Sequence, residues 1–412
     1  MNKKYLFLPI FLFTISYGLR GWAQEKGINA ILQQIEANNK ALQADKERIS
    51  YQKLENKSSN NLADPSVSFA HLWGADDKNH TAGEFVISQS FEFPTLYISR
   101  NKLNQSKANA LDAEANAYRQ QVLLQAQELC LDIIMLHQQQ LLLDQRLKNA
   151  EELKRSYDKR LKTGDANILE INKINLELLN VRTEARLNAN ALNSKLALLQ
   201  ALNGEQTLVA GRPSPDAQTT TPQLLGLTAY PITPLPVDFR PLCAELLAAD
   251  ASLQALESQK QAAQKAIAVN RQGWIPKFEL GYKRSMDNGN AMNGVVVGAS
   301  LPIFQNRHQV KMGKAQATAL DFQKENMKLE ASATLWNLYY EACQLNASIS
   351  EYKQTLEQQQ DLTLLKLALD GGEISLIEYF VEVTSVYQSK SNLLQLENQY
   401  QKVMAQIYKS KL

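Results

Sequence analysis

Two ten-residue stretches decide how this chain folds: Leu161-Lys-Thr-Gly-Asp-Ala-Asn-Ile-Leu-Glu170 and Leu369-Asp-Gly-Gly-Glu-Ile-Ser-Leu-Ile-Glu378. They lie 208 residues apart, and this offset aligns a glycine, an acidic residue and a final glutamate in each. The same offset aligns Phe93-Pro94 with Leu301-Pro302, so each proline lies 70 residues before its glycine. Similarity at a fixed offset indicates an internal repeat. The chain is therefore interpreted as a tandem duplication.

Both halves follow one plan, in which a helix, a two-stranded hairpin, a very long helix, a glycine turn and a return helix succeed one another. The expected elements are 27–62, 65–94, 97–161 and 165–203 in the first half, and 240–272, 276–302, 304–369 and 373–411 in the second. The predicted repeats are 24–203 and 241–412, with helical hairpins at about 97–203 and 304–411. Residues 204–240 carry six prolines and are expected to form an irregular connection.

The long helices are predicted from an apolar residue at every seventh position. In the first half this register includes Ala115, Val122, Leu129, Leu136 and Leu143. A sustained heptad pattern is typical of coiled-coil packing. No glycine or proline interrupts 97–163. At 1.5 Å per residue, such a helix would be about 100 Å long.

The hairpins show the alternation of β-strands. Phe278, Leu280 and Tyr282 would share one face, and Lys277 and Glu279 the other. Each strand is expected to have about 9 to 10 residues, the length that a tilted strand needs to cross a bilayer. Four strands cannot close a barrel, and an open edge in lipid would leave backbone groups unsatisfied. Three copies would supply twelve strands. The alternative is an ordinary pair of hairpins that caps a soluble helical protein.

The first 23 residues have the pattern of a secretory signal peptide: Lys3 and Lys4, an apolar run to Tyr17, and small residues before a cleavage site after Ala23. The formal net charge of the chain is +2. Removal of the three basic residues in this segment leaves 41 basic against 42 acidic residues. This balance gives no electrostatic basis for a nucleic-acid partner.

The duplicated plan, the proline that closes each hairpin and the glycine turns resemble the TolC outer-membrane efflux family. The resemblance covers essentially all of the mature chain, and the run from Gly164 to Asn172 is similar to the CzcC-like heavy-metal efflux branch. It implies a mainly α fold with a β-barrel portion: a homotrimer with a twelve-stranded barrel in the outer-membrane lipid and a helical barrel extending into the periplasm. It also implies a periplasmic adaptor and an inner-membrane pump as partners, with a passive exit channel and no enzymatic activity or cofactor.

The resemblance points to functional residues at the two glycine turns. Candidate adaptor-docking residues at the tips are Leu161, Gly164, Asp165, Leu369, Gly372 and Glu373. Glu170 and Glu378 match the position at which family members place an acidic residue lining the closed periplasmic entrance. Three copies of each would form acidic rings, which attract cations in channels. Lys173 and Val381 depart from the family's second acidic position. Helix capping and a solvated helix glutamate are the structural alternatives.

No catalytic or metal site is predicted. His71 and His80 share a hairpin, but two histidines make a weak ligand set. The sequence contains no nucleophile–base motif and no phosphate-binding loop. A different function remains open: a periplasmic coiled-coil adaptor or scaffold without a pore. The transported substrate stays undecided among metal ions, drugs and other small molecules.

Overall fold

A computed structural model of the chain describes residues 15–73, 81–208, 225–287, 289–358 and 362–412. Most of the predicted signal peptide, residues 1–14, lies outside this described part. The chain divides into two compact units. Unit 1 comprises Met1–Gln43, Arg119–Leu246 and Ser332–Leu412, and unit 2 comprises Ala44–Tyr118 and Leu247–Ala331. Each repeat contributes to both units, so the units are not the repeats.

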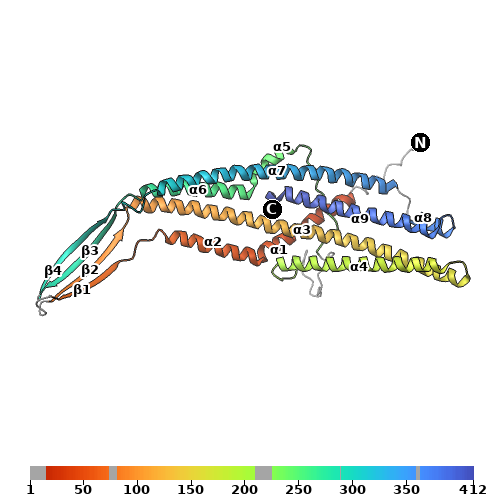
Figure 1. The fold of residues 1–412 in the computed structure, drawn as a ribbon, viewed down its shortest axis with the longest axis horizontal. Coiled ribbons are helices and arrows are strands. Elements are labelled where there is room, and N and C mark those ends of the chain that lie inside the picture. Colours follow the sequence, from red (N-terminus) through yellow and green to blue (C-terminus); the bar gives the residue numbers. More distant parts are fainter. Residues whose placement is uncertain (1–14, 74–80, 209–224, 288, 359–361) are drawn as a thin grey trace, which may run out of the picture. The chain divides into compact units, whose positions relative to one another are not determined.

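Unit 2 contains helices from both repeats. It includes most of α2 (Lys40–Ser58), the whole of α6 (Ala251–Gln272), and the first parts of α3 (Pro94–Thr163) and α7 (Gln309–Gln358) (Figure 1). Ion pairs connect these helices. Lys53 on α2 pairs with Asp112 on α3, and Lys324 on α7 pairs with Glu257 on α6. With 70 residues, α3 covers the expected long helix without a break.

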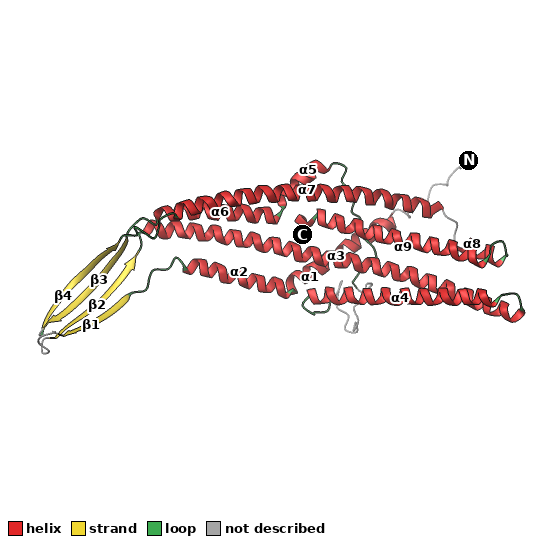
Figure 2. Ribbon diagram, in the orientation of Figure 1, coloured by secondary structure: helices red, strands yellow, loops and turns green. Residues whose placement is uncertain are grey.

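The strands of unit 2 form a single antiparallel sheet (Figure 2). They are β1 (Ser66–Trp73), β2 (Thr81–Phe91), β3 (Lys277–Asp287) and β4 (Asn290–Ser300). The order in the sheet is β1-β2-β3-β4, so the hairpin of one repeat pairs with the hairpin of the other through β2 and β3. Strands of 8 and 11 residues are found where 9 to 10 were expected. Among the described residues, β1 and β4 each have one edge without a paired strand.

Unit 1 contains α1 (Ile15–Asn38), α4 (Ile168–Leu202), most of α5 (Phe239–Ala249), α8 (Leu362–Asp370), α9 (Leu376–Ile407) and a short 3₁₀ helix (Lys409–Lys411), with the remaining parts of α2, α3 and α7. Its main core consists of apolar side chains from α1, α3, α4 and α9. The fully buried members include Ile31, Ile35, Ile133, Ile134 and Leu199. Two of the predicted heptad positions, Val122 and Leu129, are buried in this core.

The first helix of each repeat was wrongly expected to be continuous. Helix 27–62 is interrupted at Asn39, and helix 240–272 at Asp250. The two positions are 211 residues apart and cap the next helix in the same way: each side-chain oxygen accepts a hydrogen bond from the backbone N–H of a leucine, Leu42 or Leu253, at 2.9 Å. A cap of this type ends one helix and begins another because it satisfies N–H groups that lack an intrahelical acceptor.

The expected helix 304–369 also differs in the structure. Helix α7 begins at Gln309, after a turn in which His308 has a φ of 70°. A left-handed backbone is unfavourable within a right-handed helix, so the helix starts later than its apolar pattern indicates. The last part of the expected helix is described from Leu362 as α8. Residues 359–361 lie outside the described part.

One polar cluster lies within the core of unit 1. The buried carboxylate of Asp132, on α3, accepts hydrogen bonds from Lys195 on α4 at 2.8 Å and from Asn398 on α9 at 3.0 Å. Lys402, also on α9, completes the cluster at 2.5 Å. A single carboxylate thus connects the two return helices to α3.

Among the described helices, none has the length and apolar character of a membrane span.

Candidate functional site: the helical tips and the strand sheet

The first glycine turn joins α3 to α4. Gly164 has a φ of 83°, a conformation that glycine adopts without the penalty of a side chain. The backbone N–H of Asp165 donates to the carbonyl of Arg160 at 2.8 Å, which ends α3. Leu161 remains 38% exposed beside this turn. The predicted docking residues Leu161, Gly164 and Asp165 therefore lie together at an accessible helix end.

The second turn has the same backbone but a different surface. Gly372 has a φ of 76°, and the N–H of Glu373 donates to the carbonyl of Ala368 at 2.9 Å. Leu369, the counterpart of Leu161, is only 3% exposed because it packs with Leu376 and Tyr379. The structure thus brings Leu369, Gly372 and Glu373 to one tip but leaves only the glycine and the glutamate at its surface.

Glu170 and Glu378 both complete capping boxes. A carboxylate oxygen of Glu170 accepts from the backbone N–H of Asn167 at 2.7 Å, and one of Glu378 accepts from that of Ser375 at 2.8 Å. The hydrogen bonds from the backbone and side chain of Ser375 hold the pKa of Glu378 below its usual value. Both glutamates are therefore fixed at the start of a return helix, and Glu378 is charged at neutral pH.

An apolar cluster lies directly behind the tips. It combines the end of α3 with α4, α8 and α9 through Tyr157, Ile174, Leu178, Tyr379 and Val383, among others. At its edge, Asn149 on α3 donates to the hydroxyl of Tyr387 on α9 at 2.9 Å. The guanidinium of Arg146 lies 5.7 Å from the same ring and pairs with Glu177 on α4 at 2.7 Å. The two helical hairpins are thereby packed against each other near their ends.

The sheet separates its side chains into two faces. Large apolar side chains on one face are exposed in this chain, with Phe69 at 70% and Val297 at 78% exposure. The register places this face in four-strand rows such as Val67, Ile87, Tyr282 and Val295. The opposite face is polar and carries an ion pair between Glu84 and Lys283 at 2.7 Å. An exposed apolar face of this extent marks a surface that contacts a membrane or another protein.

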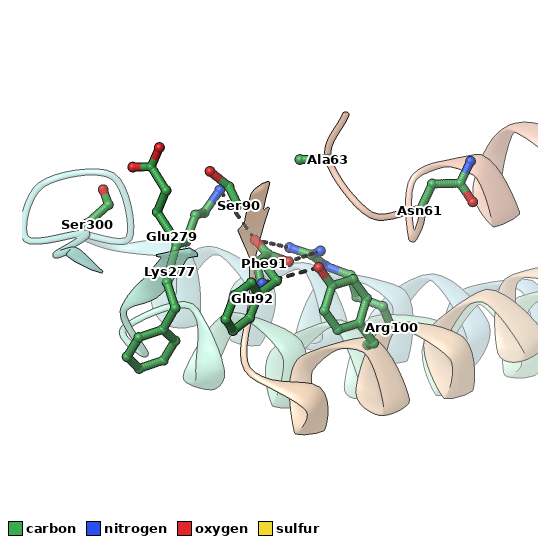
Figure 3. Close-up of a pocket in the computed structure, with 11 residues that line it drawn as sticks. Asn61, Ala63, Ser90, Phe91, Glu92, Arg100, Lys277, Glu279 and Ser300 are labelled. Atoms are coloured by element: carbon green, nitrogen blue, oxygen red, sulfur yellow. Dashed lines mark hydrogen bonds and ion pairs between the residues drawn. The ribbon is translucent and has the colours of Figure 1, made fainter. Parts of the chain in front are cut away.

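A cavity of about 550 Å³ lies where the sheet joins the helices of unit 2 (Figure 3). At its centre Glu92 accepts hydrogen bonds from both terminal nitrogens of Arg100, and Lys277 lies 3.3 Å from the same carboxylate. Figure 3 shows the Arg100 and Lys277 side chains converging on Glu92 from α3 and from the start of β3. One carboxylate thus pairs with two cations, one from α3 and one from β3.

Sequence analysis did not identify Glu92, Arg146 or Asp132 as organising residues. Glu92 gave a weak signal, since it is an acidic residue directly before the duplicated Phe93-Pro94 motif. Asp132 also gave one, because it is a charged residue within the apolar run Leu129 to Ile134. In the part of the chain that the structure describes, no group of three histidine, cysteine or acidic side chains could hold a metal ion.

Comparisons with known proteins agree with this geometry. Residues 242–410 match the family model of the outer membrane efflux protein. The structure of CusC, described as a transmembrane channel, superposes with a TM-score of 0.74 at 16% identity, covering 93% of this chain and 91% of that one. The outer membrane protein VceC of Vibrio cholerae gives 0.71 at 15% identity over 95% and 98%. The open MtrE outer membrane channel of Neisseria gonorrhoeae gives 0.72 at 15% identity over 95% and 90%. A comparison with curated protein sequences gives no significant match. The predicted resemblance and fold class are confirmed.

Proposed function

We propose that this chain is the exit channel of a three-part efflux system, because residues 242–410 match the outer membrane efflux protein family and the chain has the fold of outer membrane channels. In this proposal three copies form one pore, a periplasmic adaptor binds at the helical tips, and an inner-membrane pump supplies the energy. The cargo passes unchanged through the channel. Metal ions, drugs and other small molecules remain candidates for that cargo.

The observation that carries the proposal is the four-stranded sheet with one exposed apolar face. Lipid is the environment that suits this face, and the polar face with Glu84 and Lys283 suits a water-filled pore. The outer edges of β1 and β4 need partners, since unpaired backbone groups are very unfavourable in lipid. If β4 of each copy pairs with β1 of the next, three copies close a barrel of twelve strands.

The tips support the other half of the proposal. Gly164 and Gly372 create two similar turns, and Leu161 offers an apolar contact at one of them. An adaptor could therefore bind six related sites on a trimer. Glu170 and Glu378 would form two acidic rings near the same end, where they could attract cations.

The proposal predicts that the purified full-length chain forms stable pores. In detergent, light scattering should give the mass of three chains. In planar bilayers the trimer should show stepwise, long-lived currents that need no energy source. A monomer that remains soluble without detergent and gives no current would contradict the channel and favour a periplasmic scaffold.

Replacement of Glu378 by glutamine separates the charge of this residue from its structural role. Glutamine can still accept the hydrogen bond of a capping box, so the fold should remain intact while each trimer loses three negative charges. We expect a lower cation preference, measured as a shift in reversal potential across a salt gradient.

The matched control is Ser375→Ala, which removes the side-chain cap but keeps the carboxylate. This variant should lose about 1 kcal/mol of stability and retain its reversal potential. If Glu378→Gln conducts like the unchanged protein, the glutamate acts only as a cap and the acidic ring is excluded at this position.

A further inference from the structure

The membrane-proximal end of the second repeat carries basic residues that the fold itself does not explain. Arg271 lies at the end of α6, and Arg307, Lys311 and Lys314 lie in the turn before α7 and in its first turns. These four residues are called the basic patch below. All four are exposed, and residues 258–278 and 301–320 contain no acidic residue. The charged side chains in these two segments are therefore all positive.

Hydrogen bonds hold the two parts of the patch side by side. The side-chain amide of Asn306 donates to the carbonyl of Gly273, and that of Asn270 donates to the carbonyl of Gln309 at 3.2 Å. The end of α6 therefore lies against the start of α7. Arg271 and Arg307, which are distant in sequence, belong to one surface of unit 2.

The charges of the patch lack acidic partners in the described part of the chain. The neighbouring cations Arg100 and Lys277 share Glu92, as described for the cavity in Figure 3. In contrast, among the residues that the structure describes, none of the four patch cations has a carboxylate within ion-pair distance. Basic residues at the start of α7 also oppose the helix dipole, so they do not stabilise that helix.

The first repeat forms the same elements without a cation at these four positions, although α3 carries Arg100, Lys102 and Lys107 in its first turns. The positions equivalent to Arg271, Arg307 and Lys314 are Asn60, Ser99 and Ser106, and the position equivalent to Lys311 is Leu103. Formation of a helix, a hairpin and a long helix therefore does not need them. The four exposed cations are therefore available to bind a group outside the chain.

Exposed apolar side chains accompany the patch. Trp274 is 50% exposed, Ile303 58% and Phe304 84%. Trp274 lies three residues before β3 begins, and Phe304 lies four residues after β4 ends. Aromatic and basic side chains placed together at the end of membrane-spanning segments are typical of the interface between lipid tails and headgroups.

We propose that the basic patch binds the headgroups of anionic phospholipids in the periplasmic leaflet of the outer membrane. This inference rests on the proposed function, because it requires the strands to span that membrane. Arg271, Arg307, Lys311 and Lys314 contact the phosphates, while Trp274, Ile303 and Phe304 insert between the upper parts of the acyl chains. The lipid fixes the depth of the second repeat at the point where the strands meet the helices.

The test compares lipid retention by the detergent-solubilised trimer, counted by native mass spectrometry with phosphatidylglycerol or phosphatidylcholine. The patch variant Arg271→Asn, Arg307→Ser and Lys314→Ser carries the residues of the first repeat. Each cation near a membrane contributes about a fivefold gain in affinity for anionic lipid. The variant should therefore bind phosphatidylglycerol roughly 100-fold more weakly, with phosphatidylcholine binding unchanged.

The control variant, Lys159→Asn, Lys173→Ser and Arg186→Ser, removes the same charge from exposed positions of α3 and α4. It should retain the preference for phosphatidylglycerol. The proposal is overturned if the patch variant keeps that preference, if inorganic phosphate competes as well as the lipid does, or if the same residues instead bind peptidoglycan.

Planar-bilayer currents from the same preparations separate the two proposals. A trimer that conducts but shows no preference for phosphatidylglycerol overturns the lipid site alone. A preparation that binds the lipid through the patch but never conducts overturns the channel and leaves the lipid site in place.

Discussion

Replacement of Asp132 by alanine should lower the free energy of unfolding by about 3 kcal/mol. The substitution removes the carboxylate that Lys195, Lys402 and Asn398 all contact, and it leaves their polar groups without that partner beside a closely packed core. Removal of one member of a buried ion pair is strongly destabilising for this reason, although partial exposure of both lysines reduces the effect here. Thermal unfolding followed by helical circular dichroism would measure the change.

The control is Asp158→Ala, on the same helix. Asp158 pairs with Lys154 at the surface, so its loss should change the stability by less than about 0.5 kcal/mol. Burial alone would raise the pKa of Asp132, but the hydrogen bonds from Lys195, Lys402 and Asn398 outweigh it and lower the pKa. The stabilisation is therefore present above the pKa of an unfolded aspartate, about 3.9, and is lost as the pH falls through the lowered folded value. Equal stability of Asp132→Asn and the unchanged protein at pH 7 would contradict this account.

Replacement of Gly281 by alanine should disrupt the pairing between the two hairpins. A Cβ atom at this position would lie 2.6 Å from the carbonyl oxygen of Ile87 and 2.7 Å from the Cβ of Ser88, both on β2. Contacts this short with a neighbouring strand force the backbones apart, at a cost of about 2 kcal/mol or more. Since any gap in a membrane sheet leaves polar groups in lipid, we expect few intact trimers on unheated gels and few conducting events.

Gly294 provides the matched control for this variant. It lies on the adjacent strand β4, on the same polar face of the sheet, and a Cβ there would meet nothing within 4 Å in this chain. Gly294→Ala should therefore assemble and conduct like the unchanged protein. If both alanine variants behave alike, close approach of β2 and β3 is not the reason for glycine at position 281.

The sequence predicted the fold well because its signals are repeated. The heptads, the alternating strands and the glycine turns each occur twice, and a pattern that recurs at one offset is hard to produce by chance. The breaks at Asn39 and Asp250 were missed because the apolar register continues across them, while a single side-chain hydrogen bond decides the backbone. Comparison of the two repeats for shared capping residues would have located both.

The candidate site was only partly predictable. Glycines that need a positive φ are visible in sequence, so both tips could be placed. The burial of Leu369 could not be predicted, because its counterpart Leu161 stands in the same local sequence and remains exposed. The cluster around Asp132 depends on residues up to 270 positions apart, whose proximity follows only from the packing of α3, α4 and α9. The gating and docking roles at the tips remain predictions.

The matched helix breaks carry information about descent. After Asn39, Gln43 donates a side-chain hydrogen bond to the carbonyl of Ala37, and after Asp250, Gln254 donates one to that of Ala248, both at 3.0 Å. The two halves have diverged in most of their residues, yet this pair of bonds persists at one offset. If the two halves arose by duplication of one ancestral segment, that segment already contained the helix break.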